Sequence, residues 1–287
     1  MEKNEGSKKY PPKQYEDGKS PMQKRSMAHS CSLSSLSQVK ESIGQDAWDQ
    51  IKALKVGVIA KLVESNYVWS SKTVHYLLTR QLKIRRNEIW SVVGGRPIRF
   101  SLHEFAEITG LNTDPLPTEA CEANHNDFWA ELGVPAFEGP KFNELTKVLG
   151  ICRSWDVDKR KMLGLLFILQ VGIYGLHQNS RLPLEVAKRV FNDADMEKFP
   201  WGRVAFQSLM RGLNLVRYEA RSFTVTGCVH VLLIWAYESI QVLGEKFGKK
   251  NGLKEVPLLR WGGSRTHASI ETVISGEIKK NKKVRSG

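Results

Sequence analysis

Apolar side chains recur every three to four residues over most of the chain between residues 47 and 243, with polar side chains between them. This spacing places the apolar groups on one face of a helix, so it predicts a mainly helical protein. Asp156 and Ser222 are suitable N-caps, and Pro183 and Pro200 stand near helix starts. The predicted helices are 47–64, 72–82, 102–109, 128–132, 142–149, 157–176, 184–191, 201–213 and 222–243.

One stretch departs from the helical pattern and predicts a β-hairpin at residues 88–100. Gly94 and Gly95 separate two short segments that contain β-branched side chains. A type I′ turn needs positive φ at both central residues, which glycine adopts without strain. Ser101 and Glu104 then show the spacing of a capping box, and Gly110 stands where a helix commonly ends. The predicted fold class is therefore α+β, mostly α-helical, with one small β-hairpin.

The two ends of the chain differ in composition from its middle. Residues 1–40 are rich in Ser, Lys and Pro and hold few large apolar groups to offset the entropy cost of ordering. Residues 262–287 are rich in Gly, Ser and Lys. We expect both segments to be disordered and residues 41–261 to form a single domain, with a long surface loop at 111–126.

Positive charge is concentrated toward the ends of the chain. The whole sequence has 43 Lys and Arg against 30 Asp and Glu, for a formal net charge of +13. Residues 101–239 have only 14 Lys and Arg against 17 Asp and Glu, so the middle is slightly acidic. The composition excludes a wholly disordered chain and a polytopic membrane protein. Any affinity for a polyanion must come from the ends.

The sequence predicts neither a signal peptide nor a transmembrane segment. Its longest apolar run, MLGLLFILQVGIYGL, has 15 residues. As a helix it would be about 22 Å long, short of a hydrocarbon core of about 30 Å, so we expect a buried core helix and no membrane partner. We expect a nuclear or cytosolic location. A late basic run resembles a nuclear import sequence, although a solvated tail would look the same; its cations are Lys279, Lys280, Lys282, Lys283 and Arg285.

Familiar catalytic and metal-binding patterns are absent from the sequence. The four cysteines stand at positions 31, 121, 152 and 228 and form no CxxC pair. Cys228 and His230 are two residues apart, which places them on different faces of a helix and argues against a catalytic dyad. Cys121 and His125 have a spacing that two metal ligands could share, but they make only half a site. We therefore predict no catalytic residues, no metal and no cofactor.

The most basic segment that we expect to be folded is 72–100. Its cations could contact the phosphates of a nucleic acid, and the interleaved Tyr76, Trp90 and Phe100 could stack on bases. The alternative interpretation, which we favour, is that the aromatic side chains belong to the core and the cations form a solvated face. The candidate contacts are Lys72, Arg80, Lys83, Arg85, Arg86, Arg96 and Arg99.

Three blocks of the sequence together resemble a plant-specific domain of unknown function, DUF1985. They read KTVHYLLTRQLKIRRNEIWSVVGGRPIRFSLHEFAEITGLN at 72–112, FPWGRVAFQSLM at 199–210 and GCVHVLLIWAYESIQVLGEKFG at 227–248. The resemblance implies an origin in Mutator-like transposable elements. In their products the domain commonly precedes a Ulp1-type cysteine peptidase, whose Asp-Cys-Gly nucleophile segment does not occur here.

The resemblance supplies no catalytic residues, so it implies an accessory domain. We expect a non-catalytic module with an unidentified protein partner, which would position a Ulp1-like peptidase or a related element product. The alternative is a nucleic-acid-binding module that uses the basic segment 72–100 and the basic C-terminal run.

Overall fold

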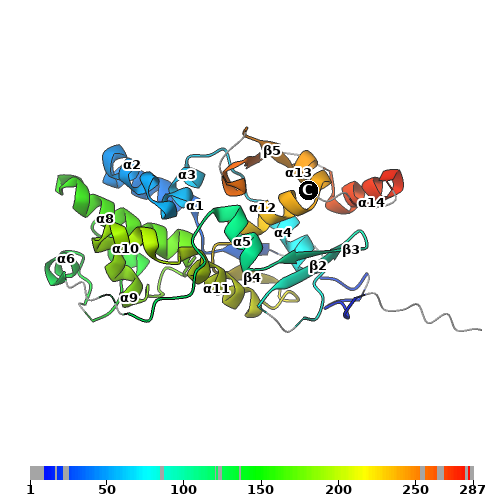
Figure 1. Cartoon of the computed structure of the whole chain (residues 1–287), viewed down its shortest axis with the longest axis horizontal. Coiled ribbons are helices and arrows are strands. Elements are labelled where there is room, and N and C mark those ends of the chain that lie inside the picture. The colour runs from blue at the N-terminus through cyan, green and yellow to red at the C-terminus, as the bar shows by residue number, and fades with distance from the viewer. Residues whose placement is uncertain are drawn as a thin grey trace, which may run out of the picture.

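The computed structural model describes residues 10–16, 18–21, 26–84, 87–119, 121, 125–135, 137–252, 256–263, 268–281 and 284. The fold is α+β and mostly α-helical, as the pattern of apolar residues predicts. Figure 1 shows an elongated molecule with two dissimilar ends. None of the helices in the described ranges has the length and apolar character needed to cross a membrane.

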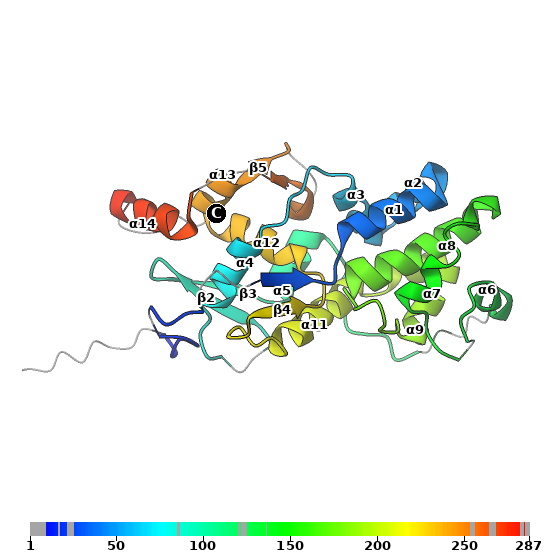
Figure 2. The same ribbon diagram turned by 180° about the vertical axis from the view of Figure 1, so that it is seen from behind.

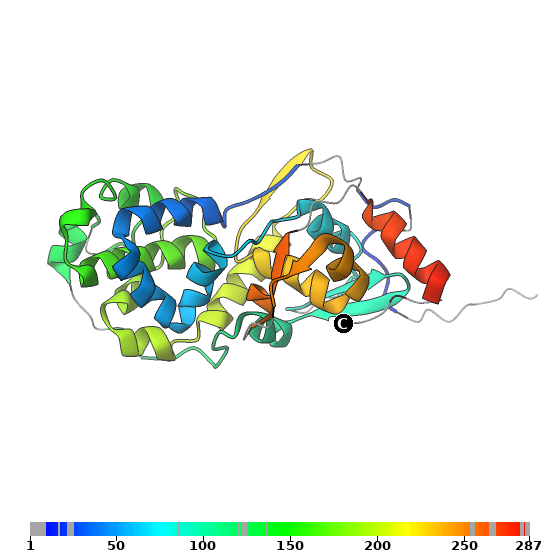
Figure 3. The same ribbon diagram turned by 90° about the horizontal axis from the view of Figure 1, so that it is seen from above.

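One end of the molecule, here called the helical end, consists of short helices packed around α8 (Val157–Phe167) (Figures 1 and 3). Its other helices are α1 (Leu33–Ile43), α2 (Gln45–Ala53), α3 (Val58–Val63), α6 (Asn126–Glu131), α7 (Phe142–Thr146), α9 (Leu184–Ala187) and α10 (Asp193–Lys198). Short 3₁₀ turns connect some of them: η1 (Lys55–Gly57), η2 (Cys152–Ser154) and η4 (Lys188–Phe191).

The opposite end, here called the hairpin end, contains the hairpin of β2 (Ile89–Val93) and β3 (Arg96–Phe100). It also holds α4 (Ser71–Leu78), α13 (Gln241–Phe247), β5 (Gly248–Lys250), η5 (Pro257–Leu259), β6 (Trp261–Gly263) and α14 (Ile270–Asn281). The middle of the molecule joins the two ends through α5 (Leu102–Thr109), α11 (Trp201–Asn214) and α12 (His230–Ser239).

The predicted hairpin is confirmed. The two strands pair antiparallel, with Ile89 opposite Phe100, and both of these side chains are buried. Gly94 and Gly95 have φ angles of 55° and 76°, as a type I′ turn requires. The strands are followed by the predicted capping box, in which the Glu104 carboxylate accepts from the Ser101 backbone N–H at 2.7 Å. A left-handed Gly110 ends α5, also as predicted.

The long apolar run is the centre of the core, as predicted. It forms the second half of α8 and then a π-helix, η3 (Ile168–Ile173), and Leu165 and Leu166 have no exposed surface. Gln170, the polar residue that interrupts the run, is fully buried and donates to the Ser180 carbonyl at 2.9 Å. Its amide nitrogen thus has a backbone partner, as buried polar groups usually do, whereas its buried Oε1 has none among the described residues.

The N-terminal segment differs from the prediction of disorder at its described residues. β1 (Ser26–His29) pairs in parallel with β4 (Ser222–Val225), as Figure 2 shows, and α1 begins at Leu33 after a Ser32 cap. Apolar groups are sparse there, yet those at 27, 31, 36 and 39 are all buried. They become ordered because distant parts of the chain supply the apolar surface against which they pack.

Three further boundaries differ from the predictions. The C-terminal residues 270–281 form α14, which packs on α13 and buries Ile270 and Ile274. Ser222 opens β4 instead of capping a helix, so α12 begins only at His230. The helix predicted at 72–82 ends at Leu78, because the next residues bond to β2, with the Leu82 N–H donating to the Trp90 carbonyl at 2.8 Å. The assignment of 41–261 to one domain stays a prediction.

Candidate functional site

A cleft of about 1080 Å³ lies at the helical end. One segment that lines it runs from the end of η4 through α10 to Pro200, and the other is the loop that follows α5. The lining side chains are mixed in character: Asp114, Pro115, Pro117, Glu119, Cys121, His125, Arg189, Phe191, Asn192, Asp195, Lys198, Phe199 and Pro200. Asp114, Pro115, Pro117 and Glu119 are exposed, so the cleft is open to solvent along this loop.

Backbone contacts hold the loop in place at the foot of the cleft. Gly202 donates its N–H to the Asn112 carbonyl at 2.8 Å, and the Asn112 side chain donates to the Lys198 carbonyl at 2.9 Å. A Cβ atom at position 202 would approach the same Asn112 oxygen to 2.8 Å, so this close contact requires glycine. Arg203 adds a bond from Nε to the Thr113 carbonyl at 3.0 Å. The predicted loop at 111–126 is thus attached to α10 and α11 at its start.

The helical wall of the cleft is built by a cap and two ring contacts. Asn192 caps α10, its side-chain oxygen accepting from the Ala194 N–H at 2.8 Å. The His125 ring stacks on Phe191, with centroids 3.9 Å apart and planes at 26°. The other face of the wall carries Arg189, whose guanidinium carbon lies 4.1 Å from the centre of the Phe199 ring. These contacts hold a flat aromatic and cationic surface toward the cleft.

The Arg189 side chain has no ionic or hydrogen-bonding partner among the described residues. Its Nε atom is buried and makes no hydrogen bond, and no carboxylate lies within salt-bridge distance of its guanidinium. Neighbouring cations of the helical end are paired instead: Lys161 contacts Asp193 at 3.0 Å, and Arg160 contacts Asp46 at 2.6 Å. An unpaired guanidinium that faces a cleft is equipped to bind an anionic group.

The half-site of Cys121 and His125 falls within this cleft. The Cys121 backbone N–H donates to Glu185 at 3.2 Å, and its thiol lies 4.0 Å from an Asp195 oxygen. His125 uses its ring for the stack on Phe191. Within the described ranges, His, Cys, Asp and Glu form no group of three or more with a geometry for a metal ion.

The predicted nucleic-acid segment is largely engaged in contacts inside the protein. Arg80 stacks on Tyr76 at 3.5 Å and lies 3.6 Å from Glu271 of α14. Arg96 donates to the Val284 carbonyl at 2.6 Å, and Arg99 pairs with Glu104 at 2.7 Å. Lys72 and Lys83 are exposed, and Arg85 and Arg86 lie outside the described residues.

Two of the three aromatic side chains of that segment are not available for stacking on bases. Tyr76 and Phe100 are buried, whereas Trp90 is half-buried. Phe100 packs against Phe105, Phe206 and Trp235 with ring centroids 5.2–6.4 Å apart. Tyr76 and Phe100 are therefore core residues. Of the predicted nuclear import run, Lys279 and Lys280 are exposed on α14, and Lys282, Lys283 and Arg285 lie outside the described residues.

His230 and Cys228 lie in a buried cluster with other partners. The His230 ring bonds through Nε2 to the Cys31 carbonyl at 2.8 Å and through Nδ1 to the Tyr67 hydroxyl at 3.1 Å. Burial lowers the pKa of His230 to about 3, so it stays neutral. Contact with the Cys228 thiol, together with burial, raises the pKa of Cys31. Both ring nitrogens of His230 are thus occupied by groups other than Cys228.

The family model described as domain of unknown function DUF1985 matches residues 78–212. The chain carries a DUF1985 domain. The match begins at the last residue of α4 and ends in α11, so it contains every residue that lines the cleft. Of the three sequence blocks that resemble DUF1985, the block at 227–248 lies beyond the matched residues. Comparison with curated proteins and with solved structures finds no match.

Sequence reasoning missed the cleft, apart from Cys121 and His125. Arg189 and Phe199 are ten residues apart on different elements, and neither belongs to a recognisable motif. The available signal was weak: Pro115, Pro117 and Pro200 mark two chain segments that cannot continue a helix or a central strand. Only the folded chain brings these segments together.

Proposed function

We propose that the DUF1985 domain is a non-catalytic protein-interaction module that binds an extended segment of a partner protein in its cleft. The observation that carries this proposal is the cleft itself, which is open along the Asp114–Glu119 loop and lined by prolines, aromatic rings and both signs of charge. Enclosed, mainly apolar pockets are typical of small-molecule sites, whereas mixed and open surfaces are typical of protein recognition.

The resemblance to transposon-encoded plant proteins suggests which partners to examine first. We propose that the module descends from a Mutator-like element and positions a Ulp1-like peptidase or a related element product, in the nucleus or the cytosol. The exposed lysines at the end of α14 support import into the nucleus. A domain that only positions a peptidase needs no catalytic group of its own.

Peptide selection on the full chain tests the binding proposal. The probe is a displayed library of random peptides of about ten residues, which span about 33 Å when extended. Selected peptides are expected to lose affinity when Asp114→Lys and Glu119→Lys are combined, because this change reverses the charge of the exposed loop. Lys147→Glu, an exposed charge reversal away from the cleft, is the matched control and should leave affinity unchanged. Equal affinity for all three proteins would place peptide binding elsewhere and overturn the proposal.

The absence of catalysis is tested separately. We expect no cleavage when the full chain is incubated with the precursor of a small ubiquitin-like modifier. The most direct contradiction would be cleavage that disappears in Cys228→Ser, since Cys228 and His230 are close in sequence. In the structure that thiol lies beside Cys31 in the interior, where a protein substrate has no access.

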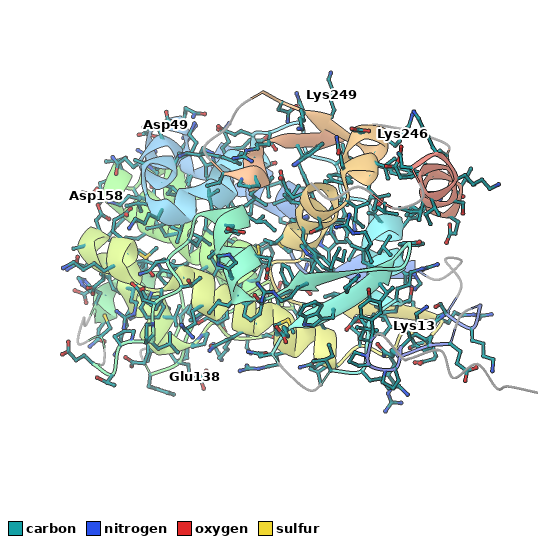
Figure 4. All side chains as sticks on the ribbon, turned by 45° about the vertical axis from the view of Figure 1, so that its right-hand side comes forward. Lys13, Asp49, Glu138, Asp158, Lys246 and Lys249 are labelled. Atoms are coloured by element: carbon teal, nitrogen blue, oxygen red, sulfur yellow. The ribbon has the colours of Figure 1, made fainter. Side chains whose placement is uncertain are left out.

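A second candidate function is nucleic-acid binding, favoured by the lysines at the hairpin end. Figure 4 places Lys13, Lys246 and Lys249 toward this end, whereas Asp49 and Asp158 lie at the helical end. Lys250, Lys279 and Lys280 are exposed on the same group of elements. These residues differ from the predicted segment 72–100, and a lysine-rich surface binds phosphates without reading bases.

A further inference from the structure

We infer that the partner segment carries an acidic side chain, Asp or Glu, which forms a salt bridge with Arg189 inside the cleft. This inference rests on the proposed function, because it names the chemistry of the segment that the cleft would bind. It assigns to Arg189 the role of anchoring residue, which neither the sequence pattern nor the family model indicates.

The position of Arg189 is set before any ligand arrives. Its guanidinium carbon lies over the Phe199 ring, 4.1 Å from the ring centre, and Phe199 is 7% exposed and packs in turn on Trp201 with ring centroids 4.6 Å apart. A stacked guanidinium keeps the N–H groups at its edge available while its face is covered. Binding an anion there costs little side-chain entropy, because the stack already restricts the side chain.

Two other arginines of the helical end have carboxylate partners, whereas Arg189 has none among the described residues. Arg181 contacts Glu138 at 2.6 Å and Glu144 at 3.0 Å, and Arg160 has Asp46. Arg189 is half-buried, and among the described residues its side chain has no carboxylate or hydrogen-bond acceptor as a partner. A partly desolvated guanidinium is stabilised by an anionic group that pairs with the N–H groups at its edge. The unpaired guanidinium therefore points to a ligand group with acceptor oxygens.

The charges around Arg189 favour a single carboxylate over a polyanion. Asp114, Glu119 and Asp195 line the same cleft, so a nucleic-acid backbone would be repelled by them at several phosphates. A peptide can place one acidic residue at Arg189, with exposed Lys198 nearby, and a basic or neutral residue beside the acidic loop. The expected occupant is thus a short segment of mixed charge, not an acidic tract.

The test extends the peptide selection on the full chain. We expect every tight-binding peptide to contain Asp or Glu at one aligned position. Replacing that residue by Asn or Gln should weaken binding about 10- to 100-fold, the range for a charge-assisted hydrogen bond. Arg189→Gln should weaken binding of the acidic peptide by a similar factor and should have little effect on the neutral peptide. This coupling separates a direct contact from a general loss of fold.

Two controls distinguish a direct contact with Arg189 from misfolding of the domain. Arg189→Lys retains the charge but loses the planar fork, so it should recover only part of the affinity. The neutral peptide is changed on the ligand side, so its weaker binding cannot reflect misfolding of the domain.

Peptides that bind the cleft equally well without an acidic residue, or with Arg189→Gln, would overturn the inference and leave the proposed function standing. Peptides whose affinity is unchanged by the combined Asp114→Lys and Glu119→Lys substitutions would overturn both the inference and the proposed function. Both would also be overturned if the protein bound single-stranded DNA in a way that depends on Arg189 but bound no peptide.

Discussion

The hairpin end and the cleft at the helical end contrast in how they use arginine. At the hairpin end, Arg80, Arg96 and Arg99 stand in the most basic folded stretch of the sequence, yet each contacts a group of the protein itself. At the cleft, Arg189 stands in a slightly acidic region and has no ionic partner in the part of the chain that the structure describes. The contrast shows that the density of charge along a sequence does not locate the charge that a ligand can use. Desolvation and local pairing decide that.

The largest expected loss of unfolding free energy concerns the aromatic core of the hairpin, and its absence would contradict this contrast. Phe100→Ala should cost about 3–5 kcal/mol of unfolding free energy, because a fully buried ring with three aromatic neighbours leaves a cavity. Urea denaturation of the purified chain measures it. A loss below about 0.5 kcal/mol is typical of surface substitutions. It would indicate that Phe100 is exposed and would again favour base stacking by segment 72–100.

The second prediction makes the same measurement in α8, the central helix of the helical end. Leu166→Ala should cost about 2–5 kcal/mol, because Leu166 has no exposed surface in the central α8. Comparable losses at Phe100 and Leu166 would show that the two ends are equally well packed and differ only in charge. A Leu166→Ala protein that melts like the wild type would contradict the position of α8.

The third prediction compares exposed lysines with a paired arginine at the hairpin end. We expect retention on duplex DNA to depend on exposed Lys246 and Lys249 and to be insensitive to Arg99. The double change Lys246→Gln with Lys249→Gln should reduce the slope of log affinity against log salt by up to about 1.8, at about 0.9 for each phosphate contact. Arg99→Gln is the matched control. An equal reduction by the control would mean that the Glu104 pair opens on binding.

The fourth prediction concerns the stability that this surface pair contributes. Arg99 pairs with Glu104 at the surface, its side chain 41% exposed, so Arg99→Gln should cost below about 1 kcal/mol. Glu104→Ala should cost more, since the Glu104 carboxylate also accepts from the Ser101 backbone in the capping box. Thermal melts of the two variants compare the two losses. Equal losses would assign the stabilisation to the ion pair instead of the cap.

The smallest expected effect is a change in acid stability at the helical end. Hydrogen bonding to Arg160 lowers the pKa of Asp46 to about 2. A lowered pKa in the folded state contributes stability above the usual Asp value of about 3.9, and this is lost as the pH falls toward about 2. Asp46→Asn should therefore flatten the acid limb of stability in that window. Asp127→Asn is an exposed control, and an equal flattening by this control would argue against a specific role for the Arg160 pair.

Local features of the fold could be predicted because short stretches of sequence specify them. Gly94 and Gly95 determine the turn, and Ser101 with Glu104 determines the start of α5, since each motif satisfies its own backbone within a few residues. The burial of the run at 162–176 follows from its apolar composition alone. The sequence by itself therefore determined the helical class, the hairpin and the core helix.

The tertiary structure alone decided which residues meet across the chain. β1 is ordered because β4, nearly two hundred residues later, pairs with it, and no local pattern marks Ser26–His29 as a strand. Arg96 is occupied because the chain returns to it at Val284, and Arg189 is unpaired because the fold brings it no carboxylate from the described residues. The physical reason is that hydrogen bonds and apolar contacts between distant segments depend on the path of the whole chain, which spacing and composition do not encode locally.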